Sequence, residues 1–328
     1  METVRVGVVG VGGMGAFHAR TLAAMAHVQL EAIADPLVET ARRLGGELGC
    51  DALSTPAELM ARTDLDGVVI ASPDETHADL AIAALERGLW VLCEKPLATD
   101  LADARRVIDA ELALGSRRIQ LGFMREYDPT HVRLVAELPQ IGAVDVVRAV
   151  HRNCSPRRRP VRQIVGQSMV HDFHSVRFIT GQTIASVHAV GSGPGDDWFR
   201  HILAVCELRS GAHAIVEFDD AGFAYEVGFE VLGQHGDLVT ATSDLVERRR
   251  NGGIETFLGD DWFARFADAY RIQDAAWIAS IRRGEAAGPS SWDGYVAQSV
   301  VDATLRSLAS GTTEQVGNAP VPPLYATT

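Results

Sequence analysis

Two short clusters of polar and ionisable side chains have types and spacings suited to moving a proton. In the first, Glu94, Lys95 and Pro96 follow directly on an apolar run at residues 89–93. A lysine at the carboxyl edge of a sheet, partly desolvated and near another positive charge, would have a lowered pKa and could hydrogen-bond or deprotonate a substrate hydroxyl. The simpler alternative is a surface lysine that pairs with Glu94.

The second cluster lies at residues 167–178 and contains two histidines. On an α-helix, Gln167, His171 and His174 would share one face at i, i+4 and i+7, while Asp172 would point about 100° away from His171. An imidazole that titrates near neutral pH suits proton transfer. Two histidines three residues apart, with no third ligand indicated, are a weak metal signal, and we expect no metal site.

Both clusters need a scaffold, and the glycine pattern near the start of the chain predicts one. The pattern stands between an apolar run at residues 4–9 and helical periodicity at 17–25, which is the strand-turn-helix context of a dinucleotide site. The first glycine permits the tight turn, the second lets a pyrophosphate approach the backbone, and the third allows the helix to pack closely on the strand. The predicted phosphate loop comprises Gly10, Gly12, Gly13, Met14 and Gly15.

An acidic residue, Asp35, stands about twenty positions beyond the last glycine of this loop, at the end of the apolar run 28–34. A carboxylate at this place would accept hydrogen bonds from the adenosine ribose hydroxyls and repel a 2′-phosphate. The sequence therefore favours NAD over NADP as the cofactor. The alternative is that Asp35 caps a helix beginning near Pro36.

Strand-like and helical runs alternate along the first third of the chain, which predicts a parallel, doubly wound Rossmann sheet. Because ligands of this fold bind at the carboxyl ends of the strands, Ser72, Pro73, Glu94 and Lys95 should face the cofactor. His77, near the start of a helix expected at 75–87, fits either a cofactor contact or a surface histidine. The expected strands are residues 4–9, 30–34, 67–71, 89–93 and 119–122.

From residue 144 the apolar pattern changes to period-2 stretches, which predict a large, open-faced and mostly antiparallel sheet in an α+β domain. We expect an α/β chain with an NAD-binding Rossmann domain at 1–122 and a substrate-binding and oligomerisation domain at 123–328, whose last helices could pack back on the first domain. A Pro-rich tail at 319–324 is interpreted as an arm or frayed end. The expected strands are 144–150, 184–190, 202–208, 213–218, 225–232 and 237–241, with helices at 168–180, 262–283 and 292–310.

Length, charge and cysteine spacing limit the kinds of partner and the cellular location that we expect. A length of 328 residues fits two domains, and a formal charge of −13 argues against nucleic acid or an anionic membrane as partner. No run reaches the length of a membrane span and no leader pattern opens the chain, so we expect a cytoplasmic protein. The four cysteines lack C-x-x-C spacing and are expected to be free thiols: Cys50, Cys93, Cys154 and Cys206.

A basic run precedes the histidine cluster and consists of Arg157, Arg158, Arg159 and, after one intervening proline and valine, Arg162. Charge runs usually face water, so a solvated loop or a subunit contact is the first interpretation. The functional alternative is that one or two of these arginines, with Arg157 as the candidate, bind a carboxylate, phosphate or sulfonate of an acidic substrate.

Taken together, these motifs resemble those of the glucose-fructose oxidoreductase, inositol dehydrogenase and rhizopine-catabolism (GFO/IDH/MocA) family, along nearly the whole chain. The C-terminal stretch is similar to the inositol dehydrogenase branch in particular. The motifs are Gly10 to Gly15, Ala34-Asp35-Pro36, the segment from Ala71 to His77, the segment from Leu92 to Leu97, Gly122 to Arg125 with Asp128-Pro129, His171-Asp172 with Arg177-Phe178, and Trp292 to Tyr295 with Ser307.

The resemblance implies NAD(P)-dependent oxidation of a secondary hydroxyl in a cyclic polyol or sugar, and a homodimer or homotetramer formed through the open sheet. It also implies that Lys95 and His171 act on the reacting hydroxyl. Asp172, His174, Arg125 and Arg157 are the further candidates for substrate contact.

One position departs from the family pattern. The family places an aspartate four residues before the histidine, and Gln167 stands there in this sequence. A neutral amide can hold a hydroxyl but cannot supply a carboxylate charge. His174 also stands where relatives are often acidic. The departures leave open a shifted substrate, a shifted assignment of acid and base, an enzyme whose cofactor stays bound, or a ligand sensor that keeps the fold without turnover.

Overall fold

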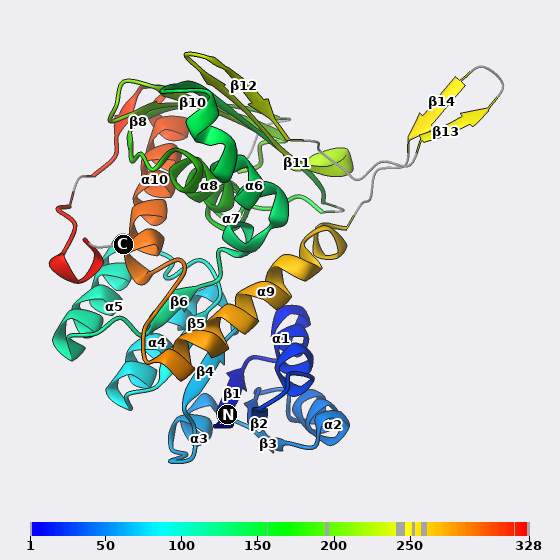
Figure 1. The fold of residues 1–328 in the computed structure, drawn as a ribbon, viewed down its shortest axis with the longest axis vertical. Helices are drawn as coiled ribbons and strands as arrows, with labels where there is room; N and C mark the ends of the chain where they lie inside the picture. Colours follow the sequence, from blue (N-terminus) through cyan, green and yellow to red (C-terminus); the bar gives the residue numbers. More distant parts are fainter. Residues whose placement is uncertain are drawn as a thin grey trace. The chain divides into compact units, whose positions relative to one another are not determined.

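The computed structural model describes residues 2–155, 157–193, 197–240, 247–250, 253–256, 261–317 and 319–326 (Figure 1). The chain forms two compact units, each of which gathers separate stretches of sequence. Unit 1 comprises residues 1–124, 270–298 and 320–328, and unit 2 comprises 125–269 and 299–319. Two long helices, α9 (Trp262–Arg283) and α10 (Ser291–Ser310), contribute residues to both units.

Unit 1 contains a six-stranded sheet in the order β3-β2-β1-β4-β5-β6, and every neighbouring pair is parallel. This is the doubly wound order of a Rossmann fold, as the alternation of strands and helices predicts. The strands are β1 (Val4–Val9), β2 (Val28–Ala34), β3 (Asp51–Leu53), β4 (Gly67–Ile70), β5 (Trp90–Cys93) and β6 (Ile119–Leu121).

The central strands of unit 1 are apolar on both faces because helices cover both faces of a parallel sheet. All four residues of β4 and all four of β5 are buried. The short strand β3, which supplies an edge of the sheet, is absent from the prediction because its three residues carry no periodic signal. The helices are α1 (Gly13–Ala23), α2 (Val38–Leu48), α3 (Pro56–Met60), η1 (Asp74–Thr76), α4 (His77–Glu86), α5 (Leu101–Leu114), η2 (Met124–Tyr127) at the boundary, and η5 (Pro323–Tyr325).

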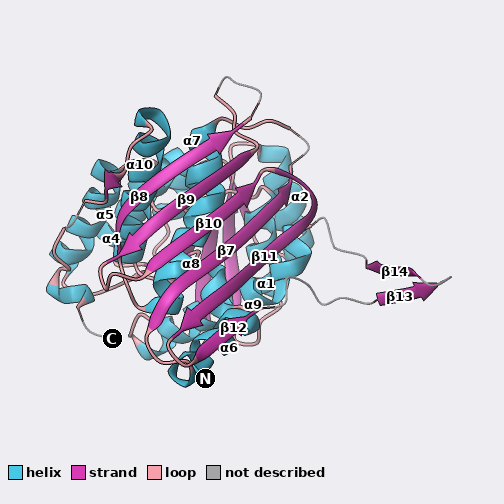
Figure 2. Ribbon diagram, turned by 90° about the horizontal axis from the view of Figure 1, so that it is seen from above, coloured by secondary structure: helices cyan, strands magenta, loops and turns pink. Residues whose placement is uncertain are grey.

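Unit 2 is built on a seven-stranded sheet in the order β12-β11-β7-β10-β9-β8-β15, in which only β7 and β10 pair in parallel. Figure 2 shows the described helices of unit 2 on one side of these strands, with the other face uncovered by any of them. Strand β9 accordingly alternates exposed and buried residues along its whole length. The strands are β7 (Val144–Cys154), β8 (Ile184–Ser192), β9 (His201–Leu208), β10 (His213–Asp219), β11 (Ala221–Gly233), β12 (Gly236–Val239) and β15 (Glu314–Gln315).

The helices of unit 2 differ from the prediction at one important point. The helix expected from residue 168 begins as a π-helical turn, η4 (Ile164–Met169), and becomes α-helical only in α8 (Val170–Thr180). The expected α-helical spacing from Gln167 to His171 is therefore wrong, because a π turn is wider than an α turn, whereas His171 and His174 both lie in α8. The other elements are α6 (Pro129–Glu137), η3 (Leu138–Gln140), α7 (Val161–Gln163), and a two-stranded hairpin of β13 (Glu247–Arg250) and β14 (Gly253–Thr256).

Two further expectations concern the strand predicted at 237–241 and the Pro-rich tail at 319–324. The predicted strand at 237–241 is observed as β12 up to Val239, and residue 241 lies outside the described residues. The Pro-rich tail, interpreted as an arm or frayed end at 319–324, leads into the turn η5, whose last residue is held against unit 1. The hydroxyl of Tyr325 donates to Glu111 at 2.8 Å, and the Tyr325 ring stacks on Trp292 with centroids 6.1 Å apart.

Candidate functional site

The glycine loop of unit 1 turns from β1 into α1 with no space for side chains at two positions. Gly10 has φ +82°, and a Cβ there would lie 2.6 Å from the Ala71 carbonyl oxygen. A Cβ at Gly15 would lie 1.7 Å from the Gly10 carbonyl oxygen, so only glycine allows the helix to sit this close to the turn.

Gly12 and Gly13 are different, because no heavy atom beyond the adjoining backbone lies within 4 Å of the position that a Cβ would take. Helix α1 begins at Gly13, and no side chain caps its first turn. The uncapped N–H groups of a helix N-terminus beside open space are the donor set that a pyrophosphate requires. The loop therefore fits the dinucleotide that its spacing predicts, with Met14 half-buried in the same first turn.

Asp35 connects the end of β2 to the glycine loop. Its Oδ2 accepts the Val11 N–H at 2.8 Å, and its Oδ1 accepts the Leu37 N–H at 2.8 Å. Helix α2 starts at Val38 with Leu37 in the N-cap position, so Asp35 does not cap it. The half-buried carboxylate is thus fixed beside the phosphate loop, and each of its oxygens keeps a lone pair that a ribose hydroxyl could use.

His77 links the two loops that follow β4 and β5. It is 1% exposed, which excludes an ordinary surface histidine. Its Nε2 lies 2.9 Å from the Ser72 carbonyl oxygen and its Nδ1 lies 2.7 Å from the Pro96 carbonyl oxygen. His77 therefore holds the Ser72-Pro73 loop and the Lys95-Pro96 turn at a fixed separation.

Glu94 and Lys95 form the turn at the carboxyl end of β5. The Glu94 side chain lies in the interior, at 5% exposure for the residue, whereas Lys95 is half-buried. One carboxylate oxygen of Glu94 accepts the Lys95 backbone N–H at 3.3 Å, and the other lies 3.1 Å from Nε2 of His18. A solvated surface pair of Glu94 and Lys95 is inconsistent with this burial of the carboxylate.

A count of basic side chains singles out Lys95. Of the 30 lysines and arginines in the chain, 29 are arginines and Lys95 is the single lysine. Arginine stays protonated at any pH at which proteins function, whereas a lysine amine can lose its proton when its surroundings lower its pKa. The one position that keeps a lysine is the one at the carboxyl edge of the nucleotide sheet.

Arg125 and Asp172 bind each other inside unit 2. Nη1 of Arg125 donates to Oδ1 of Asp172 at 2.5 Å, and both residues are almost fully buried. Nδ1 of His151 lies 2.8 Å from Oδ2 of the same carboxylate. Burial would raise the pKa of Asp172, but His151 and Arg125 outweigh it and hold the pKa below its usual range. The carboxylate is therefore a charged anchor for helix α8.

The polar network continues from this anchor to the π turn. Nε2 of His151 lies 3.1 Å from Oδ1 of Asn153, and the Asn153 amide donates to Oγ of Ser168 at 3.3 Å. Ser168 and the half-buried Gln167 are neighbours in η4, while His171, 7% exposed, lies one turn further on in α8. The network thus reaches the π turn through the side chain of Ser168, the residue next to Gln167.

Glu126 is a residue that the sequence motifs do not indicate. Its Oε1 lies 2.8 Å from Nε2 of His174, which is 2% exposed. The acid that the family resemblance expects near position 174 is absent from the helix, yet a carboxylate reaches that imidazole from η2. The signal for it is weak, because Glu126 merely follows the Gly122 to Arg125 motif.

The arginine run divides into three different environments. Arg159 forms an ion pair with the buried Asp220 and donates to Oγ of Ser168 at 3.2 Å. The guanidinium of Arg158 lies 4.8 Å from the ring centroid of Trp198. Arg157 is exposed. The interpretation as a solvated loop is therefore wrong for Arg159, whose charge offsets that of Asp220, and Arg157 is the candidate that faces solvent.

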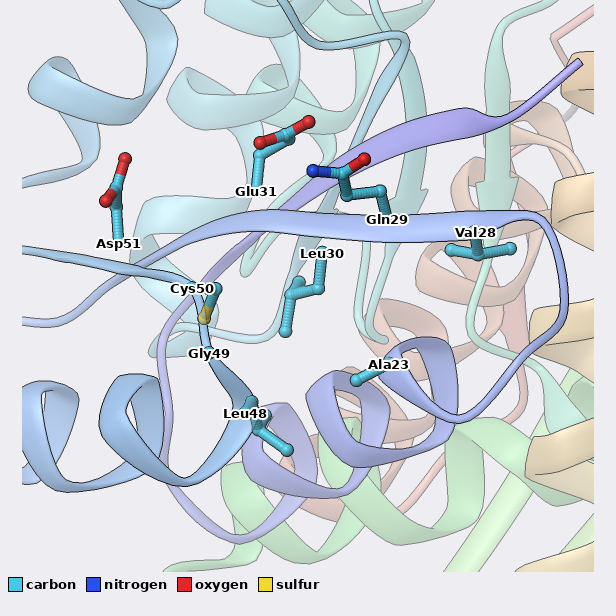
Figure 3. A pocket seen from close by; sticks show the side chains of 9 residues that line it. All are labelled: Ala23, Val28, Gln29, Leu30, Glu31, Leu48, Gly49, Cys50 and Asp51. Carbon is cyan, nitrogen blue, oxygen red and sulfur yellow. The ribbon is translucent and has the colours of Figure 1, made fainter.

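Other surface features contribute no chemistry to this site. A hollow of about 290 Å³ lies at the amino end of β2, away from Asp35, and Figure 3 shows Cys50, Glu31 and Asp51 among its lining residues. Within the described ranges, no three His, Cys, Asp or Glu side chains are grouped to hold a metal ion. None of the described helices is long and apolar enough to cross a membrane. All four cysteines are free thiols.

Comparison with protein families gives two matches along the chain. Residues 4–123 match the model of the GFO/IDH/MocA oxidoreductase family with an NAD-binding Rossmann fold, and residues 131–239 match the model of the GFO/IDH/MocA C-terminal domain. The chain belongs to the GFO/IDH/MocA family. Unit 1 accordingly carries the NAD-binding domain of an oxidoreductase, whose phosphate loop and Asp35 are described above.

Curated relatives and solved structures agree with this assignment. Inositol 2-dehydrogenase 1 of Saccharopolyspora erythraea is 38% identical, over 99% of this chain and 100% of that protein. Inositol 2-dehydrogenase of Rubrobacter xylanophilus is 35% identical, over 99% of this chain and 96% of that protein. The crystal structure of myo-inositol dehydrogenase from Lactobacillus casei in complex with NAD(H) and myo-inositol superposes with a TM-score of 0.94, at 28% identity over 98% of this chain and 99% of that chain.

Proposed function

We propose that this protein is an NAD-dependent dehydrogenase that oxidises a secondary hydroxyl of a cyclic polyol of the inositol type, or of a related sugar or sugar acid. The observation that carries the proposal is the single lysine of the chain, which stands at the carboxyl end of β5 in the NAD-binding unit. The names of the full-length relatives support the substrate class.

In this proposal Lys95 and His171 handle the proton of the reacting hydroxyl. When bound, NAD accepts the hydride from the carbon that carries this hydroxyl. Nζ of Lys95 holds the hydroxyl oxygen, and the proton passes to His171, or to Lys95 acting with it, as the carbonyl forms. Gln167 holds an adjacent hydroxyl through its amide, which donates and accepts without charge.

The remaining candidate residues of unit 2 either position the helix that carries His171 or are exposed to solvent. Arg125 and Asp172 bind each other, so they act by positioning the helix that carries His171. His174 lies on the same helix, at the position where relatives are often acidic, and pairs with Glu126 of η2. Arg157 is exposed and could bind the anionic group of a sugar acid.

The direct experiment measures NAD reduction with a panel of inositols, aldoses and sugar acids. We expect turnover of at least one cyclic polyol or sugar. Lys95→Ala should lower kcat/KM by about 100- to 10 000-fold, the usual contribution of a positioned acid or base. Turnover unaffected by Lys95→Ala would contradict the assignment.

A second candidate function is favoured by Gln167. A helix that lacks the family carboxylate four residues before His171 fits a ligand sensor that binds NAD without turnover. Calorimetry with NAD followed by the same substrate panel separates the two functions. Tight NAD binding with no oxidation of any polyol, and no reduction of the corresponding ketones, would favour the sensor.

The cofactor preference is assigned to Asp35. Asp35→Asn keeps an acceptor for one of its two backbone partners and removes the charge that disfavours a 2′-phosphate. We expect the ratio of kcat/KM for NAD to that for NADP to fall at least tenfold. An unchanged ratio would assign the preference to another residue.

We also propose that the uncovered face of the seven-stranded sheet forms a homo-oligomer. Val190, Leu203 and Val205 are 50%, 39% and 38% exposed on adjoining strands of that face. Leu203→Glu should reduce the molar mass measured by light scattering, because it buries a charge in the contact. The matched control is Val132→Glu on α6, 48% exposed, which should leave the mass unchanged.

A further inference from the structure

We propose that His18 is a positioning residue for Lys95: a buried imidazolium, held between Asp274 and Glu94, that fixes the Glu94-Lys95-Pro96 turn and offsets the negative charge beneath it. The inference deepens the proposed function and rests on it, because it assumes that Lys95 handles the substrate proton. No motif of the sequence indicates His18 or Asp274.

The three side chains come from three elements of unit 1. His18 lies in α1, Asp274 in α9, and Glu94 directly after β5. Nδ1 of His18 lies 2.9 and 3.0 Å from the two Asp274 oxygens, and Nε2 lies 3.1 Å from Oε1 of Glu94. His18 and Asp274 are fully buried and Glu94 is 5% exposed, so the contacts are shielded from water.

While both carboxylates are ionised, the donor and acceptor count requires a charged ring. Burial raises the pKa of Asp274, and the charge and hydrogen bond of His18 oppose this rise. An ionised carboxylate only accepts hydrogen bonds, and a neutral imidazole donates from only one nitrogen. With a carboxylate on each side, both ring nitrogens donate only if the ring is protonated. Burial opposes this protonation, but the Asp274 and Glu94 carboxylates outweigh burial and raise the pKa of His18 to about 10.

The ring is also confined by its apolar surroundings. Tyr270 of α9 and Phe17 of α1 meet it edge to face, each with centroids 6.1 Å away. Besides Asp274 and Glu94, the titratable groups that face this cluster include Lys95 and His77, which act on Glu94, and the buried Cys93 thiol, whose pKa is raised by burial and by Glu94. With His18 protonated, the side chains of His18, Asp274 and Glu94 together carry one net negative charge, and loss of that proton would leave two negative charges in the interior.

Glu94 transmits this constraint to Lys95. One of its oxygens faces His18 while the other accepts the Lys95 backbone N–H at 3.3 Å. A Cβ at Gly122, at the end of β6, would lie 3.0 Å from the carboxylate, so the side chain fills a slot with no spare room. Burial raises the pKa of Glu94, but the hydrogen bond and charge of His18 outweigh it and the pKa stays below its usual range.

His18 also joins the lysine turn to the phosphate loop. It lies on α1, one turn beyond the Gly15 that packs on Gly10. One side chain therefore connects the helix whose N-terminus faces the cofactor phosphates with the turn that carries Lys95. Asp274 binds the same ring from α9, so the part of unit 1 formed by residues 270–298 also contacts this cluster.

The single lysine makes a direct test possible. Protein labelled with [13C]lysine gives one Cε signal, whose shift with pH reports the ionisation of Lys95 alone. In His18→Gln the charge of Glu94 is no longer offset, and we expect the Lys95 titration to move to higher pH by about one unit, which is a tenfold smaller fraction of neutral amine at a given pH. The pH profile of kcat/KM should move by the same amount, with kcat affected more than KM.

The matched control is His131→Gln. His131 is another buried histidine beside a carboxylate, Asp128 at 2.6 Å, but it belongs to unit 2. It should leave the Lys95 signal and the pH profile unchanged even if it lowers the unfolding midpoint as much as His18→Gln does. A purely structural His18 would behave in the same way as this control.

Histidine ring NMR on the unmodified protein gives a readout that needs no substrate. We expect both nitrogens of His18 to be protonated from neutral pH to about pH 9, since its pKa is about 10. A ring that is neutral at pH 7, or a Lys95 titration unmoved in His18→Gln, would overturn the inference. If Lys95 shifts as expected but no polyol is oxidised, the proposed function fails and the coupling of His18 to Lys95 stands.

Discussion

Two buried networks, one in each unit, place a histidine beside a carboxylate and give it opposite character. In unit 1, His18 lies between two carboxylates and its pKa is raised to about 10 despite full burial. In unit 2, His151 shares the Asp172 carboxylate with Arg125, and burial together with the Arg125 charge holds its pKa below the ordinary value. The neighbouring charges, not burial alone, decide in which direction the pKa of each histidine moves.

The two networks therefore have different roles. A charged His18 influences the electrostatics of the turn that carries Lys95, whereas His151 extends a hydrogen-bond chain through Asn153 to the π turn beside Gln167. We expect changes in the first network to alter pH dependence and kcat. Changes in the second should alter stability and substrate affinity.

The largest effect should follow from breaking the second network at Arg125. Arg125→Met leaves the Asp172 carboxylate buried without its arginine partner, and removal of one member of a buried pair costs about 3–5 kcal/mol of unfolding free energy. Urea unfolding measures the loss. The double variant with Asp172→Leu should regain at least half of it, and no recovery would show that the helix is held by other contacts.

An effect of intermediate size should appear in the pH dependence of folding stability, to which His18 and His151 contribute in opposite directions. The His18 contribution to stability is complete below about pH 6.5 and is lost as pH rises through its folded pKa of about 10. For His151, whose folded pKa is lowered, stability is instead lost as pH falls below about 6.5.

Each group gives a slope of about 1.4 kcal/mol per pH unit where its folded and unfolded forms differ by one proton. Urea unfolding between pH 5 and 10 should show a flatter alkaline limb in His18→Gln and a flatter acid limb in His151→Gln. The same change in both variants would remove the distinction between the networks.

The smallest effect should be a loss of substrate affinity when Gln167 of the π turn is replaced. Gln167→Ala removes one neutral hydrogen bond to a substrate hydroxyl, worth about 0.5–1.5 kcal/mol, so KM for the polyol should rise about 2- to 12-fold with little change in kcat. Gln163→Ala, an exposed glutamine on the preceding turn, is the control and should leave KM unchanged. A fall in kcat alone would assign Gln167 to the chemical step.

Local pattern was enough to predict much of unit 1. The glycine loop, the strand before it and the acid after β2 are neighbours in sequence, and the geometry that they require is set by turns and by strand ends. The Rossmann order of the sheet and the mostly antiparallel second sheet follow from periodicity in the same way.

The partners within the site could not be predicted from pattern. His18 meets Asp274 across 256 residues and Arg125 meets Asp172 across 47, and helix periodicity carries no information about which buried polar groups pair. The π turn at Ile164–Met169 was missed because its apolar spacing is close to that of an α-helix. The single lysine, by contrast, was visible in composition once lysine and arginine are counted separately.

The central claim is that Lys95 acts in catalysis because its amine can lose a proton. Lys95→Arg tests this claim most directly. The chain uses arginine for all of its other 29 lysine or arginine positions, so this substitution keeps the charge in a form the protein already uses. Steady-state NAD reduction with the best polyol, measured across pH, should fall about 100- to 10 000-fold with NAD affinity retained. Turnover close to wild type in Lys95→Arg, with an unchanged pH profile, would contradict the account.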